Sequence, residues 1–339
     1  MGPADADHPR GVLQERPRLA LIPYRAQLLA GRPARTPEAV CERLLAVQAQ
    51  DPRGFRLAIR ARTSGLTVAD VDAALASGSL VVSWLNRGTL HLVRPEDYWL
   101  LHPLTSPQVA TGNAARLRQE GVSPRDAERG VGAVVEALAD GPLGRTALRA
   151  AVEAAGVRVA GQALVHVLVL ATLRGLVVRG PMVGKEHGFV LVSSWLGPPV
   201  VWDRDEALAE LGRRYAVAHG PATDRDLAKW AGIRVTDARK ALDGVRQPRA
   251  VAEVPPPRLL GAFDEVLMGW ESRDAVLGQH AGKVVSGGLF RPFALVDGVA
   301  AGTWRIEKER VVVEPFGHLD TSLLDAEARD VERFLDLRT

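Results

Sequence analysis

The sequence predicts an α+β protein with three tandem winged-helix modules, a small antiparallel β-barrel and a C-terminal helix. Amphipathic helices recur in three rounds of roughly 70–90 residues, and strand-like segments close each round. After Pro255-Pro256-Pro257 the apolar period changes to two, which indicates short strands. We expect a disordered N-terminus at 1–17, winged-helix modules at 18–120, 121–200 and 201–254, and the barrel with its helix at 255–339.

The composition is that of a globular protein with an aliphatic core. The chain has 339 residues, of which 47% are hydrophobic and only 5% aromatic. No apolar run reaches about 18 residues, and the polar N-terminus has no secretory signal. We therefore expect a cytoplasmic monomer without a membrane segment. The single cysteine, Cys41, excludes an intramolecular disulfide framework.

The kind of basic residue is more informative than the net charge of +3. Only five of the 43 basic residues are lysines, and none precedes Lys185. Arginine is a planar, permanently charged phosphate binder. The N-terminal half has no lysine that could form a Schiff base.

The first module contains a helix that ends near two glutamines. Thr36 is a good N-cap and Pro37 suits the first helical position. Asp51 precedes a proline, which excludes it from the α region, so the helix ends at or before it. Gln48 and Gln50 share a face only if the chain is already extended there. The pattern fits a polar helix end or a functional site.

The rest of the first module has the order of a winged helix. Arg53, Arg56 and Arg60 share one side of a predicted helix. The hairpin turns at Asn86-Arg87-Gly88, which places an arginine at its tip. The predicted elements are helices at Arg18–Ala30, Gly54–Thr63 and Val68–Ala76, and strands at Leu80–Trp84 and Thr89–Val93.

The later elements follow the same reasoning. In the second round we expect helices at Ser123–Ala139, Arg145–Ala154 and Gln162–Arg174, and a hairpin of Leu176–Arg179 with Gly188–Val192. We expect the third round to start near Asp205, to pass through Gly220–Leu227 and to end with Arg234–Val245 and a strand near Ala250–Val254. Barrel strands are expected at Arg258–Ala262, Val284-Val285, Phe290–Val296, Val299–Ile306 and Arg310–Phe316, and Ser322–Leu337 is expected to cover an open sheet edge.

Several kinds of site are poorly supported. The eight histidines are scattered and have no cysteine partners, so no metal is expected. A Gly-x-Ser-x-Gly elbow and a phosphate-binding loop are missing, so no nucleotide cofactor is expected. His91 is either a structural hairpin residue or a group that reaches a ligand. Asp264-Glu265 is either an acid pair of a site or part of a turn at a barrel corner.

Together, four segments resemble the AlkZ/YcaQ-type winged-helix DNA glycosylases. They are Gln48-Ala49-Gln50-Asp51-Pro52, Trp84–Val93, Ala262–Trp270 and Gly302-Thr303-Trp304, and the resemblance spans about 18–316. It implies winged helices and a β-barrel around a DNA channel. It also implies monofunctional excision of alkylated purines from double-stranded DNA, including the unhooking of interstrand crosslinks, for self-resistance or repair.

The resemblance assigns Gln48 and Gln50 as the catalytic residues; the YcaQ branch has aspartate at the second position, so the chain sides with the AlkZ branch. Glycosidic cleavage normally uses carboxylates, but a purine alkylated at N7 already carries positive charge and leaves without protonation. Asp51, His91, Asp264 and Trp270 are candidates for site support. The candidates for DNA contact are Arg53, Arg56, Arg60, Asn86, Arg87 and Thr89.

A different class of protein also fits the helices and hairpins. A winged-helix transcription regulator with a ligand-sensing barrel explains these elements, but not the paired glutamines at a helix break.

Overall fold

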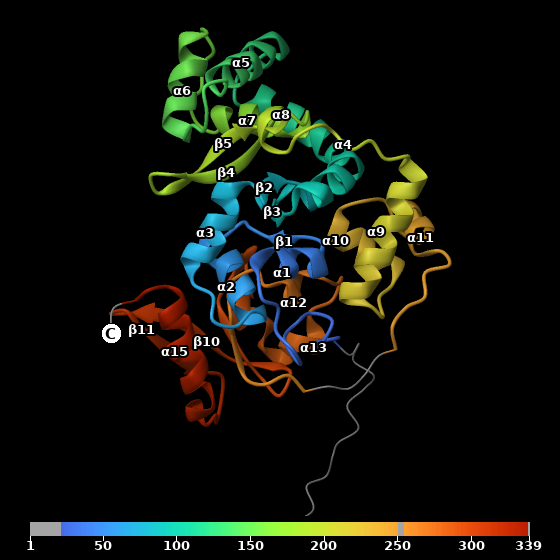
Figure 1. Cartoon of the computed structure of the whole chain (residues 1–339), viewed down its shortest axis with the longest axis vertical. Helices are drawn as coiled ribbons and strands as arrows, with labels where there is room; N and C mark the ends of the chain where they lie inside the picture. The colour runs from blue at the N-terminus through green and yellow to red at the C-terminus, as the bar shows by residue number, and fades with distance from the viewer. Residues whose placement is uncertain (1–21, 250–253, 338–339) are drawn as a thin grey trace, which may run out of the picture.

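The computed structural model describes residues 22–249 and 254–337 (Figure 1). The predicted disordered segment, 1–17, lies outside the described residues. The first part of the chain contains α1 (Pro37–Leu44), β1 (Val47–Gln48), α2 (Pro52–Arg62), α3 (Val68–Ser77), β2 (Val81–Trp84), the 3-10 turn η1 (Asn86–Gly88) and β3 (Leu90–Val93).

The second part contains α4 (Pro95–Gln119), α5 (Pro124–Ala137), α6 (Arg145–Ala154), α7 (Ala163–Leu173), β4 (Val177–Val183), β5 (Glu186–Leu191) and α8 (Val192–Trp195). The third contains α9 (Arg204–His219), α10 (Asp224–Ala231) and α11 (Val235–Leu242). The C-terminal part contains β6 (Arg258–Leu260), α12 (Glu265–Met268), α13 (Asp274–Leu277), η2 (Gly278–His280), α14 (Ala281–Val284), β7 (Val285–Ser286), β8 (Leu289–Phe290), β9 (Phe293–Val296), β10 (Val299–Glu307), β11 (Arg310–Pro315), η3 (Thr321–Leu324) and α15 (Asp325–Phe334).

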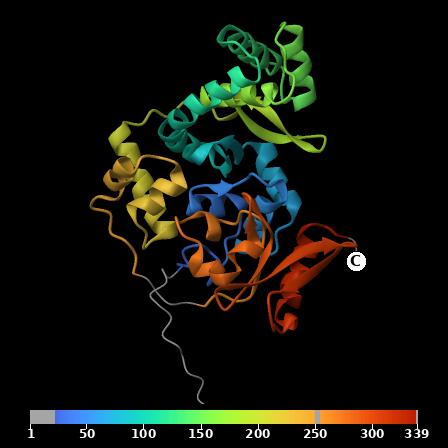
Figure 2. The same cartoon turned by 180° about the vertical axis from the view of Figure 1, so that it is seen from behind.

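The two predicted hairpins belong to one sheet rather than forming two separate wings. Five antiparallel strands lie in the order β1-β3-β2-β4-β5. The hairpins meet where Val82 of β2 pairs with Arg179 of β4. Figure 2 shows this sheet between the upper helices and the C-terminal part. Since the first hairpin is an inner part of a sheet, it is not a free projection.

The predicted β-barrel is wrong, because the C-terminal sheet is open. Four strands lie in the order β11-β10-β9-β6, and β7 and β8 form a separate pair. Helix α15 contacts both edge strands, β11 and β6. The prediction that the last helix covers an open sheet edge is consistent with these contacts. The predicted strand near Ala250–Val254 lies largely outside the described residues.

The predicted helix at Arg18–Ala30 is not present in its described part. Residues 22–30 form turns, because their side chains bind distant parts of the chain. Tyr24 Oη donates to the carbonyl oxygen of Gly298 at 2.7 Å. Gln27 Nε2 donates to the carbonyl oxygen of Ala218 at 2.9 Å. The segment therefore joins the C-terminal sheet to α9.

The described residues form neither a membrane span nor a metal-binding cluster. None of their helices is long and apolar enough to span a membrane. Across the same residues, no group of three or more His, Cys, Asp or Glu side chains is placed to hold a metal ion.

Candidate active site

The helix that precedes the two glutamines ends before either of them. Thr36 Oγ1 accepts from the backbone of Ala39 and caps α1, whose last residue is Leu44. Leu45 then adopts φ 70° and turns the chain. Gln48 lies in β1 and pairs with His91 of β3. The predicted break is therefore confirmed, and the chain is extended at Gln48.

Groups from three distant segments hold Gln48. Its carboxamide Oε1 accepts from Arg87 Nη2 at 2.8 Å. Its backbone nitrogen donates to Glu265 Oε1 at 2.6 Å. The other oxygen of Glu265 accepts from the indole nitrogen of Trp230 at 3.4 Å. Gln48 is only 3% exposed, so these contacts fix both its backbone and its carboxamide in a desolvated environment.

Gln50 differs from Gln48 because it is exposed. Its Oε1 accepts weakly from the backbone nitrogen of Leu90, at 3.4 Å. The backbone nitrogen of Ala49 donates to the carbonyl oxygen of Leu90 at 2.7 Å. The extended pairing with β3 thus continues past Gln48. Gln50 can rearrange toward a ligand at little cost, whereas Gln48 cannot.

Asp51 is the N-cap of α2. Its Oδ1 accepts from the backbone nitrogens of Arg53 at 2.8 Å and Gly54 at 3.1 Å. Carboxylates at this position stabilise a helix by satisfying its first amide groups. The carboxylate of Asp51 therefore anchors the segment that carries both glutamines.

Arg87 lies between the glutamine segment and α10. It has φ 57°, and its Nη1 donates to the carbonyl oxygens of Trp230 and, at 3.2 Å, Lys229. A Cβ on Gly232 would lie 2.6 Å from the Arg87 backbone nitrogen, so only glycine allows this approach. Burial lowers the pKa of Arg87. The hairpin tip is therefore a packed part of the site.

Asn86, a predicted candidate for DNA contact, is fully buried. Neither the nitrogen nor the oxygen of its side-chain carboxamide has a hydrogen-bond partner among the described residues. Thr89 is half-buried, and its hydroxyl donates to the carbonyl oxygen of Asn86 at 3.1 Å. The unmet amide groups of Asn86 lie next to Arg87 in the chain.

Glu265 is a site residue that the sequence did not single out by itself. Burial raises its pKa to about 7, although the Gln48 backbone amide and Arg87 favour the charged form. Its hydrogen bonds with the Gln48 backbone amide and with Trp230 form only where the first, third and C-terminal parts of the chain meet. The one available signal was an acid pair, Asp264-Glu265, inside an otherwise apolar run.

Asp264 and Trp270 are satisfied within the protein. Asp264 forms a fully buried bidentate pair with Arg62, with both N–O distances at 2.8 Å. It also caps α12 by accepting from the backbone nitrogen of Val266 at 3.0 Å. The indole nitrogen of Trp270 donates to the carbonyl oxygen of His219 at 3.1 Å. Both residues connect parts of the fold.

His91 is buried and neutral at physiological pH. Its Nδ1 lies 3.0 Å from the carbonyl oxygen of Thr89, and its Nε2 has no partner. Burial, followed by the charge of Arg87, lowers its pKa to about 3. In the sheet His91 lies directly between Gln48 and Ser83, so the three side chains share one face.

The predicted basic face of α2 is wrong for two of its three arginines. Arg56 is buried, and its Nε donates to Asp72 at 2.9 Å. Arg60 is buried and pairs with two carboxylates of α15, Glu327 at 2.7 Å and Asp330 at 3.1 Å. Only Arg53 is exposed. Helical spacing placed the three on one side, but that side packs against acidic groups from distant segments.

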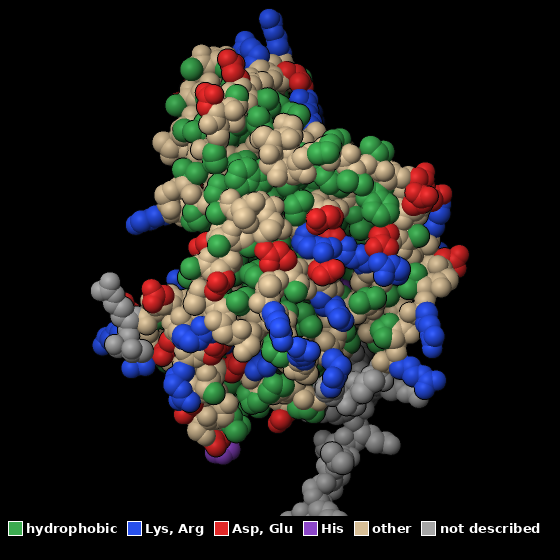
Figure 3. Space-filling model, in the orientation of Figure 1, with side chains coloured by type: hydrophobic (Ala, Val, Ile, Leu, Met, Phe, Trp, Pro, Cys, Tyr) green, Lys and Arg blue, Asp and Glu red, His purple; other side chains and the backbone are tan. Residues whose placement is uncertain are grey.

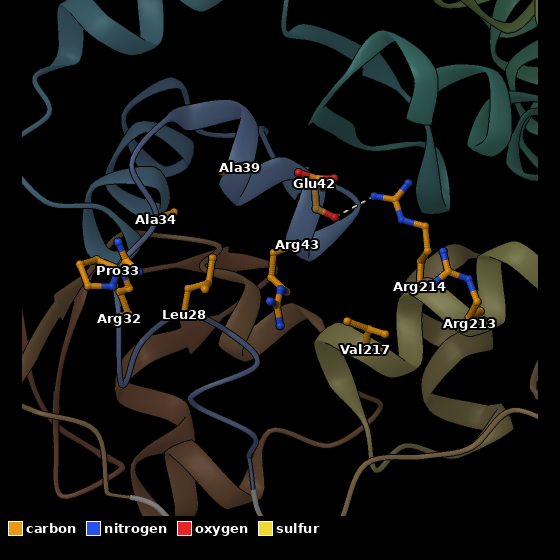
Figure 4. A pocket seen from close by; sticks show the side chains of 10 residues that line it. All are labelled: Leu28, Arg32, Pro33, Ala34, Ala39, Glu42, Arg43, Arg213, Arg214 and Val217. Atoms are coloured by element: carbon orange, nitrogen blue, oxygen red, sulfur yellow. Dashed lines mark hydrogen bonds between the residues drawn. The ribbon is translucent and has the colours of Figure 1, made fainter.

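A cavity of about 460 Å³, separate from the contacts of Gln48, opens between α1 and α9 (Figure 4). Arg32, Arg43, Arg213 and Arg214 line it. Figure 3 shows acidic and basic side chains interspersed on this face of the molecule. Since the cavity shares no lining residue with the contacts of Gln48, it is not part of the candidate site.

Comparisons with known proteins agree with this fold. The chain is 28% identical to an interstrand DNA cross-link repair glycosylase from Streptomyces sahachiroi, over 90% of this chain and 91% of that protein. The structure is similar to that of the DNA glycosylase AlkZ from Streptomyces sahachiroi, with a TM-score of 0.76 and 26% identity over 92% of this chain and 94% of that one. The sequence model of the AlkZ-like DNA glycosylases matches residues 41–336. The chain belongs to the AlkZ-like DNA glycosylase family.

Proposed function

We propose that this DNA glycosylase is monofunctional and hydrolyses the N-glycosidic bond of cationic N7- or N3-alkylated purines. Its substrates include bulky adducts. They also include interstrand crosslinks, as the name of the Streptomyces sahachiroi relative suggests. The observation that carries the proposal is the fixed position of Gln48, whose carboxamide accepts from Arg87 and whose backbone nitrogen donates to Glu265.

The chemistry suits carboxamides because the leaving base needs no proton. A cationic purine departs as a neutral base, so the enzyme has to place a water molecule and stabilise positive charge on the sugar. A carbonyl oxygen has two acceptor positions, and Arg87 occupies one at Gln48 Oε1. The second acceptor position of Gln48 Oε1 and the carboxamide of the exposed Gln50 supply the dipoles that stabilise positive charge on the sugar.

A general acid would be needed for neutral bases, and His91 does not provide one. Its lowered pKa keeps the imidazole unprotonated at pH 7. Among the described contacts, no hydrogen bond joins a lysine amine to Gln48 or Gln50. We therefore propose that the reaction leaves an intact abasic site, without β-elimination.

Three duplexes test this function. Each carries one N7-methylguanine, one N7-guanine adduct with a bulky apolar group, or one uracil. The expected result is release of both alkylated bases, no uracil release, and strand breaks only after alkali is added. Efficient uracil excision would contradict the cationic-base mechanism, and nicking without alkali would contradict the monofunctional reaction.

A transcription regulator with a ligand-sensing sheet remains the second candidate from the sequence. The buried Gln48–Arg87–Glu265 contacts favour a reaction over sequence reading, since an operator-binding residue has to reach a base edge. Sequence-specific DNA binding without any base release would favour the regulator.

A further inference from the structure

We propose that the cavity between α4, α7 and the β2–β3 hairpin tip binds the apolar body of a bulky adduct while its purine occupies the glutamine site. This inference rests on the proposed function and names a second binding site for the same substrate. The occupant is the aromatic or aliphatic group that is covalently attached to the alkylated purine.

The cavity has the size and lining of a small-molecule site. Its volume is about 400 Å³, within the range of roughly 300–1,000 Å³ that is usual for ligand pockets. Apolar side chains and glycines supply most of its lining: Trp84, Val109, Val165 and Val169, with Gly88, Gly112 and Gly232.

The cavity adjoins the candidate active site at Arg87. The same side chain lines the cavity and donates to Gln48 Oε1 at 2.8 Å. A purine placed at Gln48 would therefore have its substituent next to the cavity entrance. This adjacency favours a group attached to the substrate over an unrelated ligand.

The polar groups of the cavity are either satisfied or placed at its rim. Asn113 Nδ2 donates to the carbonyl oxygen of His166 at 3.0 Å, and Asn113 Oδ1 lies 2.9 Å from His166 Nδ1. Gln108 and Arg116 are exposed. Since the interior offers few unpaired donors or acceptors, it fits an apolar group better than a sugar or a phosphate.

Gly112 provides a clean way to fill the cavity. A Cβ at this position of α4 would meet no atom within 4 Å. A Gly112→Leu substitution therefore places an isobutyl group in open space and favours the helix. The matched control is Gly132→Leu, because Gly132 is an exposed glycine of α5 with the same open surroundings and does not line the cavity.

The experiment compares single-turnover release of N7-methylguanine with release of an N7-guanine adduct that carries a naphthyl group. In Gly112→Leu, two or more carbons of the adduct should lose their burial in the cavity. Release of the naphthyl adduct by this variant should therefore slow by about tenfold or more. Methylguanine release by this variant, and both reactions of Gly132→Leu, should stay within about twofold of the wild type.

Each other outcome is decisive. Equal rates of naphthyl-adduct release by Gly112→Leu and wild type would overturn the inference. An equal loss of methylguanine and naphthyl-adduct release would show that the cavity holds DNA itself, and would also overturn it. If the wild type released methylguanine but not the naphthyl adduct, the inference would fail while the glycosylase activity stood. Release of neither base by the wild type would refute the proposed function.

Discussion

Gln48 is surrounded by groups that fix both its side chain and its backbone. Arg87 orients its carboxamide, and Glu265 holds its backbone amide. The positive charge of Arg87 opposes positive charge on the sugar. Glu265 offsets it above about pH 7, where its carboxyl group is ionised. We therefore propose that these residues act in catalysis through positioning and charge balance.

Replacing Arg87 should affect the chemical step more than DNA binding. In Arg87→Ala, the Gln48 carboxamide loses its partner and its orientation, and kcat for N7-methylguanine release should fall about 10²-fold. The control, Arg53→Ala, should weaken DNA binding in a salt-dependent way with kcat nearly unchanged. An Arg87→Ala variant with weaker binding and unchanged kcat would show that Arg87 only contacts DNA.

Glu265 should make stability fall as pH rises. Its folded-state pKa of about 7 exceeds the ordinary 4.5, so between these values the folded protein binds more protons than the unfolded chain. This group should therefore cost roughly 3 kcal/mol of stability between about pH 4.5 and 7. Glu265→Gln removes the titration, and the difference in unfolding free energy from wild type should change across this window. Parallel pH profiles of the two proteins would contradict the assignment.

At the element scale, local signals in the sequence predicted most helices. Thr36, Thr67 and Ser123 each precede a helix that starts at the next residue. Helix α4 was missed, because Pro103 and Pro107 lie inside it and proline normally argues against a helix interior. Helix α4 packs against α7, η1 and α9, and the local sequence does not reveal these contacts.

Strand pairing was less predictable than the strands themselves. The two hairpins were correctly located, but their union through β2 and β4 depends on a contact between Val82 and Arg179, nearly a hundred positions apart. The period of two identifies a strand without naming its partner. For the same reason, the C-terminal strands suggested a barrel where the sheet is open.

Asp51 should act through the stability of α2. Asp51→Ala removes the N-cap and should lower the free energy of unfolding by about 1 kcal/mol, whereas Asp51→Asn keeps the acceptor and should cost only a few tenths. Denaturant unfolding of both variants tests this. Equal stability of Asp51→Ala and wild type would show that the cap contributes little.

At the scale of the whole molecule, the candidate site exists because distant parts of the chain meet. Gln48 comes from the first part, Trp230 from the third and Glu265 from the C-terminal part. The sequence supplied Gln48, Gln50 and Arg87, whose pattern is local. It did not reveal that Arg56, Arg60 and Asn86 are buried, since their partners or neighbours lie in other parts of the fold.

The buried Arg62–Asp264 pair joins α2 to the C-terminal part. Arg62→Met leaves an unpaired buried carboxylate and should lower the free energy of unfolding by about 3–5 kcal/mol. The double variant Arg62→Met/Asp264→Asn removes that charge and keeps the cap of α12, so it should be more stable than Arg62→Met alone. A single variant that loses less than about 1 kcal/mol would contradict this role.

The most direct test of the catalytic role of the two glutamines is single-turnover release of N7-methylguanine by Gln48→Ala, Gln50→Ala and the double variant, with DNA affinity measured in parallel. The account predicts that the double variant binds the duplex as tightly as the wild type and releases no base above the uncatalysed rate. Base release by the double variant at the wild-type rate would contradict it.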